Sequence, residues 1–128
     1  LHGWGGLPGF VREASGPGWA LVGDAGYFRD PITTHGMTDA MRDAELLAGA
    51  VLAGWGGTVP ESEALEDYQL RRDALSASLF EATDRIAAYD WDLSEIRQML
   101  RLVSSAMTDE VELLQSLMAP RQTAVPSR

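Results

Sequence analysis

Apolar residues recur at helical spacing through most of the chain after residue 36, and this pattern predicts a fold dominated by α-helices. In the first stretch the apolar side chains recur every three or four residues for about four turns, at Met37, Ala40, Met41, Ala44, Leu47, Ala48, Val51 and Leu52. The opposite side of this predicted helix carries Asp39, Arg42, Asp43 and Glu45. We therefore expect the apolar side to pack and the charged side to face water.

Three more helices are expected to follow. Glycines at 54, 56 and 57 end the first helix, and Pro60 precedes a second that runs from about Glu61 to Tyr89. Its near-heptad stripe, which predicts packing against other helices, is Leu65, Tyr68, Leu75, Leu79, Ala82, Ile86 and Tyr89.

Asp92 and Glu95 form a capping box that opens a third helix. Its expected buried face is Leu93, Ile96, Leu100, Val103 and Met107. Thr108 or Asp109 is expected to cap a fourth helix, which Pro120 ends. Residues 121–128 read as a disordered tail.

The first part of the chain favours loops and one or two short strands. Residues 1–18 hold six of the thirteen glycines and two of the six prolines, with one short strand expected at 9–12. Trp19 to Val22 is apolar without alternation and lies between Gly18 and Gly23, which favours a strand covered on both faces. Because so few strands cannot form a stable sheet, we expect neighbouring strands outside this chain.

Composition argues against several classes of function. Ten basic and nineteen acidic residues give a formal net charge of −9, without the basic cluster that a nucleic-acid-binding protein needs. The chain has no cysteine, so disulfides and thiolate catalysis are excluded, and His2 and His35 alone cannot make a metal site. Redox chemistry would therefore require a bound organic cofactor.

The sequence predicts neither a membrane span nor a secretion leader. No apolar run approaches the roughly twenty residues that cross a bilayer, and no basic segment precedes a hydrophobic one at the N-terminus. We expect a cytoplasmic protein. The chain begins at Leu1 without Met and with a glycine-rich run at residues 3–6, so we expect it to be a fragment of a longer protein.

The segment from Gly23 to Met37 is the strongest candidate for a binding site. Gly23 and Asp24 follow the predicted strand, and a loop with Pro31 and Gly36 leads into the first helix. A carboxylate at a strand end accepts hydrogen bonds from hydroxyl groups, while the N–H groups of a helix N-terminus favour negative charge. This arrangement suits a ligand that has both hydroxyl groups and negative charge.

The same segment resembles the second flavin-contacting motif of FAD-dependent monooxygenases of the aromatic-hydroxylase type, and especially their bacterial oxidoreductase branch. The matching elements are Gly23-Asp24-Ala25, Pro31, Gly36-Met37 and residues 43–48, with the order Asp-Ala-Glu-Leu-Leu-Ala. The resemblance covers residues 7–53 and weakens beyond them. It implies the C-terminal part of such an enzyme, and hence an FAD cofactor.

The implied fold is an α/β fragment, mostly α, with one or two short strands from a Rossmann-like FAD domain followed by about four helices. Residues 1–57 would be the last part of the FAD-binding domain, residues 58–120 a helical C-terminal segment and residues 121–128 the tail. The family's G-x-G-x-x-G loop, which holds the ADP half of FAD, does not occur in this chain. A missing N-terminal Rossmann part is the partner expected to supply it.

The resemblance also implies roles for individual residues. Gly23 and Asp24 would place a carboxylate against the ribityl hydroxyls of FAD. Gly36 and Met37 would bring the helix N-terminus to the flavin ring, and Pro31 would shape the loop beside it. These five residues are the predicted cofactor-binding set, and we assign no catalytic residue to this chain.

The other residues near the motif have more ordinary expected roles. His35 is of a type that suits an acid or base, but we expect a solvent-facing loop histidine. Arg29 and Asp30 are expected to be solvated loop charges. Asp43 is expected to serve helix packing and hydrogen bonding. Two aromatic residues, Tyr27 and Phe28, either line a pocket or pack under the loop.

By resemblance, the parent protein would be an FAD-dependent monooxygenase in which NAD(P)H reduces the flavin and oxygen passes to a small organic substrate. Many relatives have His where Tyr27 or Phe28 stands and Gly where Thr34 stands, which leaves subgroup and substrate open. A flavin-dependent reductase or halogenase remains an alternative. So does a non-enzymatic acidic helical domain that binds a protein partner. We expect the 128 residues alone to be inactive and to bind FAD poorly.

Overall fold

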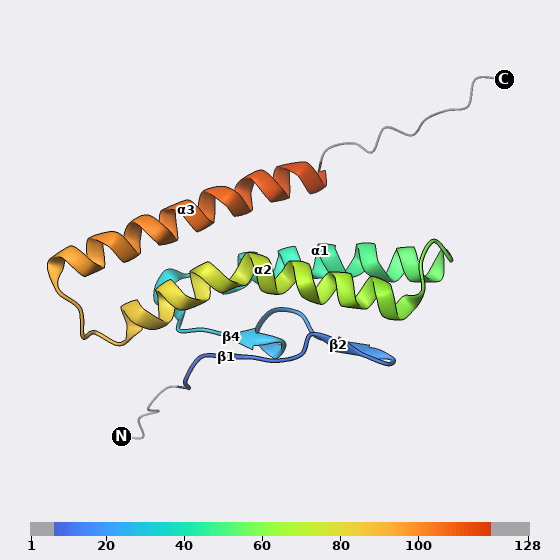
Figure 1. The fold of residues 1–128 in the computed structure, drawn as a ribbon, viewed down its shortest axis with the longest axis horizontal. Helices are drawn as coiled ribbons and strands as arrows, with labels where there is room; N and C mark the ends of the chain where they lie inside the picture. The colour runs from blue at the N-terminus through green and yellow to red at the C-terminus, as the bar shows by residue number, and fades with distance from the viewer. Residues whose placement is uncertain (1–6, 119–128) are drawn as a thin grey trace.

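The structure is a computed structural model that describes residues 7–118, and helices dominate it (Figure 1). The helices are α1 (Gly36–Trp55), α2 (Glu61–Ala87) and α3 (Leu93–Met118). Before them come four two-residue strands and two short 3-10 helices: β1 (Phe10–Val11), β2 (Ser15–Gly16), β3 (Trp19–Ala20), η1 (Gly23–Ala25), β4 (Tyr27–Phe28) and η2 (Pro31–Thr33). The mostly α fold with a few short strands is confirmed. The glycine-rich run at residues 3–6 and the predicted tail lie outside the described residues.

The elements are arranged so that α2 lies between α3 and the small strands, with α1 beside it (Figure 1). One core cluster joins α2 to α3 and consists of Leu79, Ala82, Ile86, Met99 and Val103. A second cluster, Ala14, Leu46 and Tyr68, joins the segment before β2 to α1 and α2. The predicted packing stripe of the second helix is therefore confirmed over most of its length, whereas Tyr89 lies beyond the helix end and is exposed. The division of the chain at residue 57 stays a prediction.

The strands form two antiparallel pairs. Phe10 pairs with Phe28 in β1–β4, and Ser15 pairs with Ala20 in β2–β3. The prediction of a strand at residues 19–22 covered on both faces is wrong: β3 ends at Ala20, and Trp19 is 44% exposed. The physical reason is the turn before it, because Gly18 has a φ of 78° and folds the chain back onto β2.

Residues 93–118 form one continuous helix where two were expected. The capping box is confirmed: the Asp92 carboxylate accepts from Glu95 N at 2.9 Å, and the Glu95 carboxylate accepts from Asp92 N at 2.8 Å. Thr108 does not start a new helix, because its hydroxyl donates to the carbonyl of Ser104 one turn earlier. The expected buried face is confirmed for Val103, which is buried, and for Ile96 and Met107, which pack against the core. It is wrong at Leu93 and Leu100, which are exposed, and Met99 is buried instead.

The expected orientation of α1 is wrong at its N-terminal end. Met37 and Met41 are 78% and 73% exposed, whereas Arg42 and Asp43 are 1% and 0% exposed. Asp39, Arg42 and Asp43 face inward because they bond to one another and to groups on neighbouring elements. Glu45 is exposed and Leu47 packs against a core cluster, as expected. The exposed side is an apolar row that consists of Met37, Met41, Ala44, Ala48, Leu52 and Trp55. Among the described residues, no helix combines the length and the apolar composition that a bilayer crossing requires.

Tyr68 of α2 connects the helices to the loop after β3, and it gives a testable pH dependence. It is 1% exposed and its hydroxyl donates to the Leu21 carbonyl at 2.6 Å. Burial, and secondarily the charge of Asp43, raises the pKa of Tyr68 to about 12. In the unfolded chain a tyrosine ionises near pH 10, so the unfolded state loses its proton first as the pH rises.

We therefore expect the free energy of unfolding to fall between about pH 10 and pH 12, with Tyr68 contributing about 2 to 3 kcal/mol of that fall. Tyr68→Phe should lack this part of the fall, although it is less stable at neutral pH because the Leu21 bond is lost. Urea unfolding followed by circular dichroism at several alkaline pH values measures both effects. Identical alkaline slopes in the two proteins would contradict the assignment.

Candidate functional site

Three of the predicted cofactor-binding residues line one small cavity at the N-terminus of α1. The cavity has a volume of about 90 Å³. Its lining consists of Asp24, Tyr27, Phe28, Arg29, Asp30, Pro31, Thr34, His35, Gly36 and Asp39. A Cβ atom added to Gly36 would lie 3.7 Å from Asp24 Oδ1, so the carboxylate lies beside the first residue of the helix. Both groups of the predicted motif, carboxylate and helix N-terminus, therefore meet here.

Gly23 and Met37 are placed differently from the other three. Gly23 has a φ of 54°, and a Cβ atom there would lie 2.8 Å from the Cβ of Ala40. Its N–H donates to Asp43 Oδ2 at 3.2 Å. Gly23 thus allows the close contact between η1 and α1, which fixes the position of Asp24. Met37 lies at the start of the exposed apolar row, beside the cavity lining but outside it.

The loop before α1 is shaped by its own short hydrogen bonds. Asp30 Oδ1 accepts from Ile32 N at 2.9 Å, and Pro31 begins η2 with the φ that proline favours. Thr34 ends η2 with a φ of 56°. His35 is the N-cap residue of α1 and makes no side-chain cap bond, so the first N–H groups of the helix are available to a ligand.

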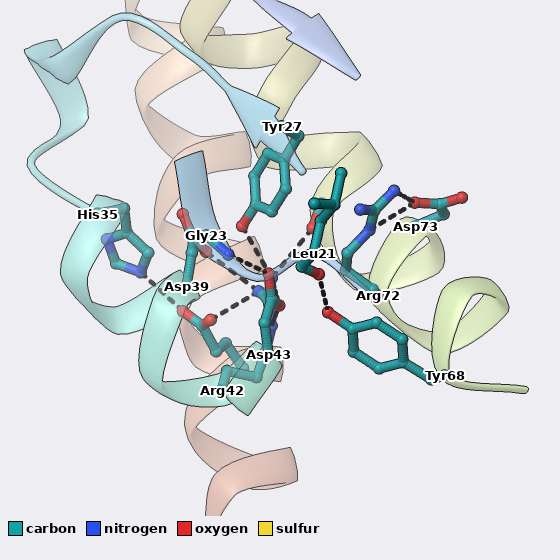
Figure 2. Close-up of polar contacts among 12 residues, drawn as sticks. Leu21, Gly23, Tyr27, His35, Asp39, Arg42, Asp43, Tyr68, Arg72 and Asp73 are labelled. Atoms are coloured by element: carbon teal, nitrogen blue, oxygen red, sulfur yellow. Dashed lines mark hydrogen bonds and ion pairs between the residues drawn. The ribbon is translucent and has the colours of Figure 1, made fainter. Parts of the chain in front are cut away.

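A buried ionic network lies directly beneath this cavity, and Arg42 is at its centre (Figure 2). The Arg42 guanidinium donates to Asp43 Oδ1 at 2.9 Å, to Asp39 Oδ1 at 3.1 Å and to Glu110 Oε1 at 2.8 Å. It also donates to the hydroxyls of Tyr27 and Ser76. One cation from α1 thereby joins β4, α2 and α3, which explains why the charged side of α1 is its buried side.

Asp43 anchors the network to the strand side of the cavity. Burial raises the pKa of Asp43, while Arg42 and the Gly23 N–H act in the opposite direction. The expectation that Asp43 serves hydrogen bonding within the fold is confirmed. Tyr27 is 2% exposed, and burial raises the pKa of its hydroxyl. Its ring also lines the cavity, so both alternatives left open for Tyr27 apply.

Arg29 is not the solvated loop charge that was expected. It is 7% exposed and its Nη2 bonds to Asp39 Oδ2, while Nε and Nη1 have no hydrogen-bond partner among residues 7–118. Arg29 directly follows β4, and the pairing of β4 with β1 places its side chain under the loop. Asp30 is exposed, as expected. The cavity therefore combines an arginine and a helix N-terminus with two exposed carboxylates.

His35 is not the solvent-facing residue that was expected either. Its side chain is 14% exposed, and Nε2 lies 2.7 Å from Oε2 of Glu110 on α3 (Figure 2). Glu110 was missed by the sequence-based prediction. Its spacing carried a signal, because it follows Met99, Val103 and Ala106 on the inward side of α3 at helical intervals. An acidic residue on such a side predicts a buried partner of opposite charge.

A larger cavity of about 420 Å³ lies between the ends of α1 and α2 that meet at the connection, but no predicted site residue lines it. Its charged lining residues include Asp67 and Arg71, which form an exposed ion pair at 2.8 Å. The smaller cavity is the better candidate because hydrogen-bond donors, carboxylates and aromatic side chains converge on it. At about 90 Å³ it has room for the edge of a ligand, equal to about three water molecules.

Comparison with known proteins gives one relevant similarity. The chain is 36% identical over 92 residues to a tryptophan 2-halogenase of Chondromyces crocatus. The match covers 66% of this chain and 18% of that protein, so the chain spans less than a fifth of the length of this relative. No family model matches the chain. No solved structure matches it.

Proposed function

We propose that this chain is part of a flavin-dependent enzyme and contributes the ribityl and ring-edge side of an FAD site. The observation that carries the proposal is the position of the Asp24 carboxylate beside Gly36 at the N-terminus of α1. A carboxylate accepts hydrogen bonds from the ribityl hydroxyls, and the helix N-terminus favours the negative charge of a reduced ring. The similarity to a tryptophan 2-halogenase supports a flavin enzyme independently.

The residues of the cavity fit this cofactor in their chemistry. Asp24, Pro31 and Gly36 would contact FAD directly, with Gly36 allowing close approach of the backbone. Gly23 would act by placing Asp24, and Met37 by the N–H group that it adds to the helix N-terminus. When bound, FAD supplies the redox chemistry, and the residues of this chain hold and orient it. Other parts of the parent enzyme would bind the ADP half, as the size of the cavity also suggests.

Two reactions are candidates for the parent enzyme. The motif from Gly23 to Met37 favours a monooxygenase that uses NAD(P)H and transfers oxygen to a small organic substrate. The similarity to a tryptophan 2-halogenase favours halogenation of an aromatic substrate such as tryptophan. Incubation of the parent enzyme with FAD, NAD(P)H, oxygen and chloride, followed by mass analysis of the product, separates an added oxygen atom from an added chlorine atom.

The cofactor assignment is tested by Asp24→Ala in the parent enzyme. We expect the variant to lose most of its flavin, because a charge-assisted contact of about 1.5 to 3 kcal/mol corresponds to an affinity loss of roughly 10-fold to 150-fold. Asp84→Ala, which removes an exposed carboxylate from α2, is the matched control and should retain flavin. Flavin absorbance per protein and the dissociation constant for FAD are the measurements.

Two outcomes would contradict different parts of the proposal. Wild-type flavin content in Asp24→Ala would remove the role given to Asp24, while the flavin assignment itself would stand. A parent enzyme that neither purifies with flavin nor binds added FAD would overturn the proposed function as a whole.

A further inference from the structure

We propose that His35 exchanges a proton with the ligand in the Asp24–Gly36 cavity, and that Glu110 of α3 is the residue that positions it. The identity of the ligand, FAD, rests on the proposed function. The pairing of His35 with Glu110 rests on the contacts of this structure alone. These two parts can therefore fail separately.

Glu110 is fixed on both of its oxygens. Oε1 accepts from Arg42 Nη1 at 2.8 Å, and Oε2 lies 2.7 Å from His35 Nε2. Its side chain is 7% exposed and that of Arg42 is 1% exposed, so neither can turn into water. Arg42 is in turn held by Asp39, Asp43, Tyr27 and Ser76. Glu110 therefore presents a fixed hydrogen-bond acceptor to the imidazole ring.

This acceptor decides which nitrogen of His35 carries a hydrogen. Because the carboxylate oxygen accepts, Nε2 must donate, and Nδ1 is the nitrogen that can gain or lose a proton. A carboxylate that orients a histidine in this way also stabilises the imidazolium ion when it forms. In Figure 2 the dashed line from His35 starts at one ring nitrogen, and the other ring nitrogen lies away from that line.

In the proposed arrangement Nδ1 faces the ligand, because His35 belongs to the cavity lining. His35 lines the cavity together with Asp24 and Gly36, and its side chain keeps 14% of its surface exposed. In the proposed step the Nδ1 lone pair takes a proton from an N–H or O–H group of the ligand, which keeps the electron pair of that bond. The imidazolium later returns the proton to the ligand or to water. The pairing with Glu110 is kept throughout.

The charged groups around His35 come from three parts of the chain. Arg42 and Asp39 belong to α1, and Glu110 belongs to α3. Asp24 of η1 and the two residues after β4, Arg29 and Asp30, come from the segment before α1. From α2, the groups that contact this region are the hydroxyls of Ser76 and Thr83. Any pH dependence assigned to His35 must therefore be separated from these carboxylates, which requires a direct signal from the imidazole ring.

Nuclear magnetic resonance of ¹⁵N-labelled parent protein provides that signal, with FAD as the probe. We expect a His35 Nε2–H proton that exchanges slowly with water, and we expect added FAD to shift the Nδ1 resonance. Glu110→Gln should speed the exchange of the Nε2 proton, whereas Asp109→Asn, which changes its exposed neighbour on α3, should not. His35→Gln identifies the resonances.

Turnover provides the second test. His35→Gln should retain flavin but lose roughly 100-fold in kcat, which is the usual size of an acid–base contribution. Because His35 lies at the cavity edge and outside the two core clusters, its variant tests the proposal even if Glu110→Gln fails to fold.

A different result would overturn each part of this proposal. Flavin bound with His35 resonances unchanged, or His35→Gln with a wild-type kcat, would overturn the proton exchange. A His35 ring without a protected Nε2–H would overturn the role of Glu110. A parent protein without flavin would overturn the proposed function together with the ligand named here.

Discussion

Replacing Arg42 with methionine is expected to lower the free energy of unfolding by about 3 to 5 kcal/mol, the usual cost of removing one partner from a buried ion pair. Arg42 is 1% exposed and bonds to three carboxylates, on Asp39, Asp43 and Glu110. Methionine has an unbranched side chain that is shorter than that of arginine, and it cannot donate a hydrogen bond. Three buried carboxylates would then lie close together without the cation that they share.

The pH dependence of this loss identifies its cause. Burial already raises the pKa of Asp43, and without Arg42 its charged form is less stable still. A group with a raised folded-state pKa costs stability as the pH rises through that pKa. The destabilisation by Arg42→Met should therefore be largest at neutral pH and should shrink as the pH falls towards 4, where an unfolded Asp takes up its proton at about 3.9.

Urea unfolding at several pH values measures both quantities. Arg71→Met is the matched control, because Arg71 forms an ion pair with Asp67 in which both side chains are at least 58% exposed. Such pairs contribute about 0 to 1 kcal/mol. If the two arginine variants lost similar amounts of stability, the network around Arg42 would have no special role in this fold.

Gly23→Ala is expected to cost about 2 to 5 kcal/mol, from two separate causes. A residue with a Cβ atom at a φ of 54° pays about 1 to 2 kcal/mol in backbone strain. The added Cβ would also lie 2.8 Å from the Cβ of Ala40, and overpacking of this kind usually costs about 1 to 3 kcal/mol. Relief of the clash would move η1 away from α1 and lengthen the Gly23–Asp43 bond.

Gly18→Ala separates the two causes. Gly18 also has a positive φ, 78°, but a Cβ atom there would meet nothing within 4 Å. We expect this variant to lose about 1 to 2 kcal/mol, from strain alone. Thermal or urea unfolding of both variants gives the comparison. An equal loss in the two proteins would mean that the close approach of residue 23 to Ala40 does not affect the free energy of unfolding.

The helical part of the fold could be predicted from the sequence because its signals are local. The end of α1 at the glycines after residue 53, the start of α2 after Pro60 and the capping box at Asp92 all depend on neighbouring residues. The helix break expected near Thr108 was wrong because the local signal at a threonine is ambiguous. A threonine is compatible with a helix interior when its hydroxyl bonds to the preceding turn, and sequence alone does not distinguish this from a cap.

The orientation of α1 could not be predicted from its periodicity. Apolar spacing identifies a face but does not say which neighbour covers it, and near the start of α1 the described neighbours cover Asp39, Arg42 and Asp43 instead. Arg42 is buried because Glu110, Tyr27 and Ser76 lie on other elements and meet it only in the folded chain. The same limit explains why His35 was expected to face solvent, since its partner is 75 residues away.

One part of the candidate site could be predicted from the sequence and another could not. Asp24 and Gly36 are brought together by a short loop whose proline and Asp turn are visible in the sequence, so their proximity follows from local rules. The network beneath the loop depends on α3 and has no local signal apart from the spacing of Glu110.

The contact between Glu110 and Arg42 spans 68 residues and has a consequence for the order in which the site assembles. The α1–α2 and α2–α3 pairs are joined by short connections, so their contacts can form with little loss of chain entropy. Glu110 can reach Arg42 and His35 only after both pairs have formed. We therefore expect the loop around Asp24 to take shape early, and the imidazole of His35 to find its fixed orientation in the last stage of folding.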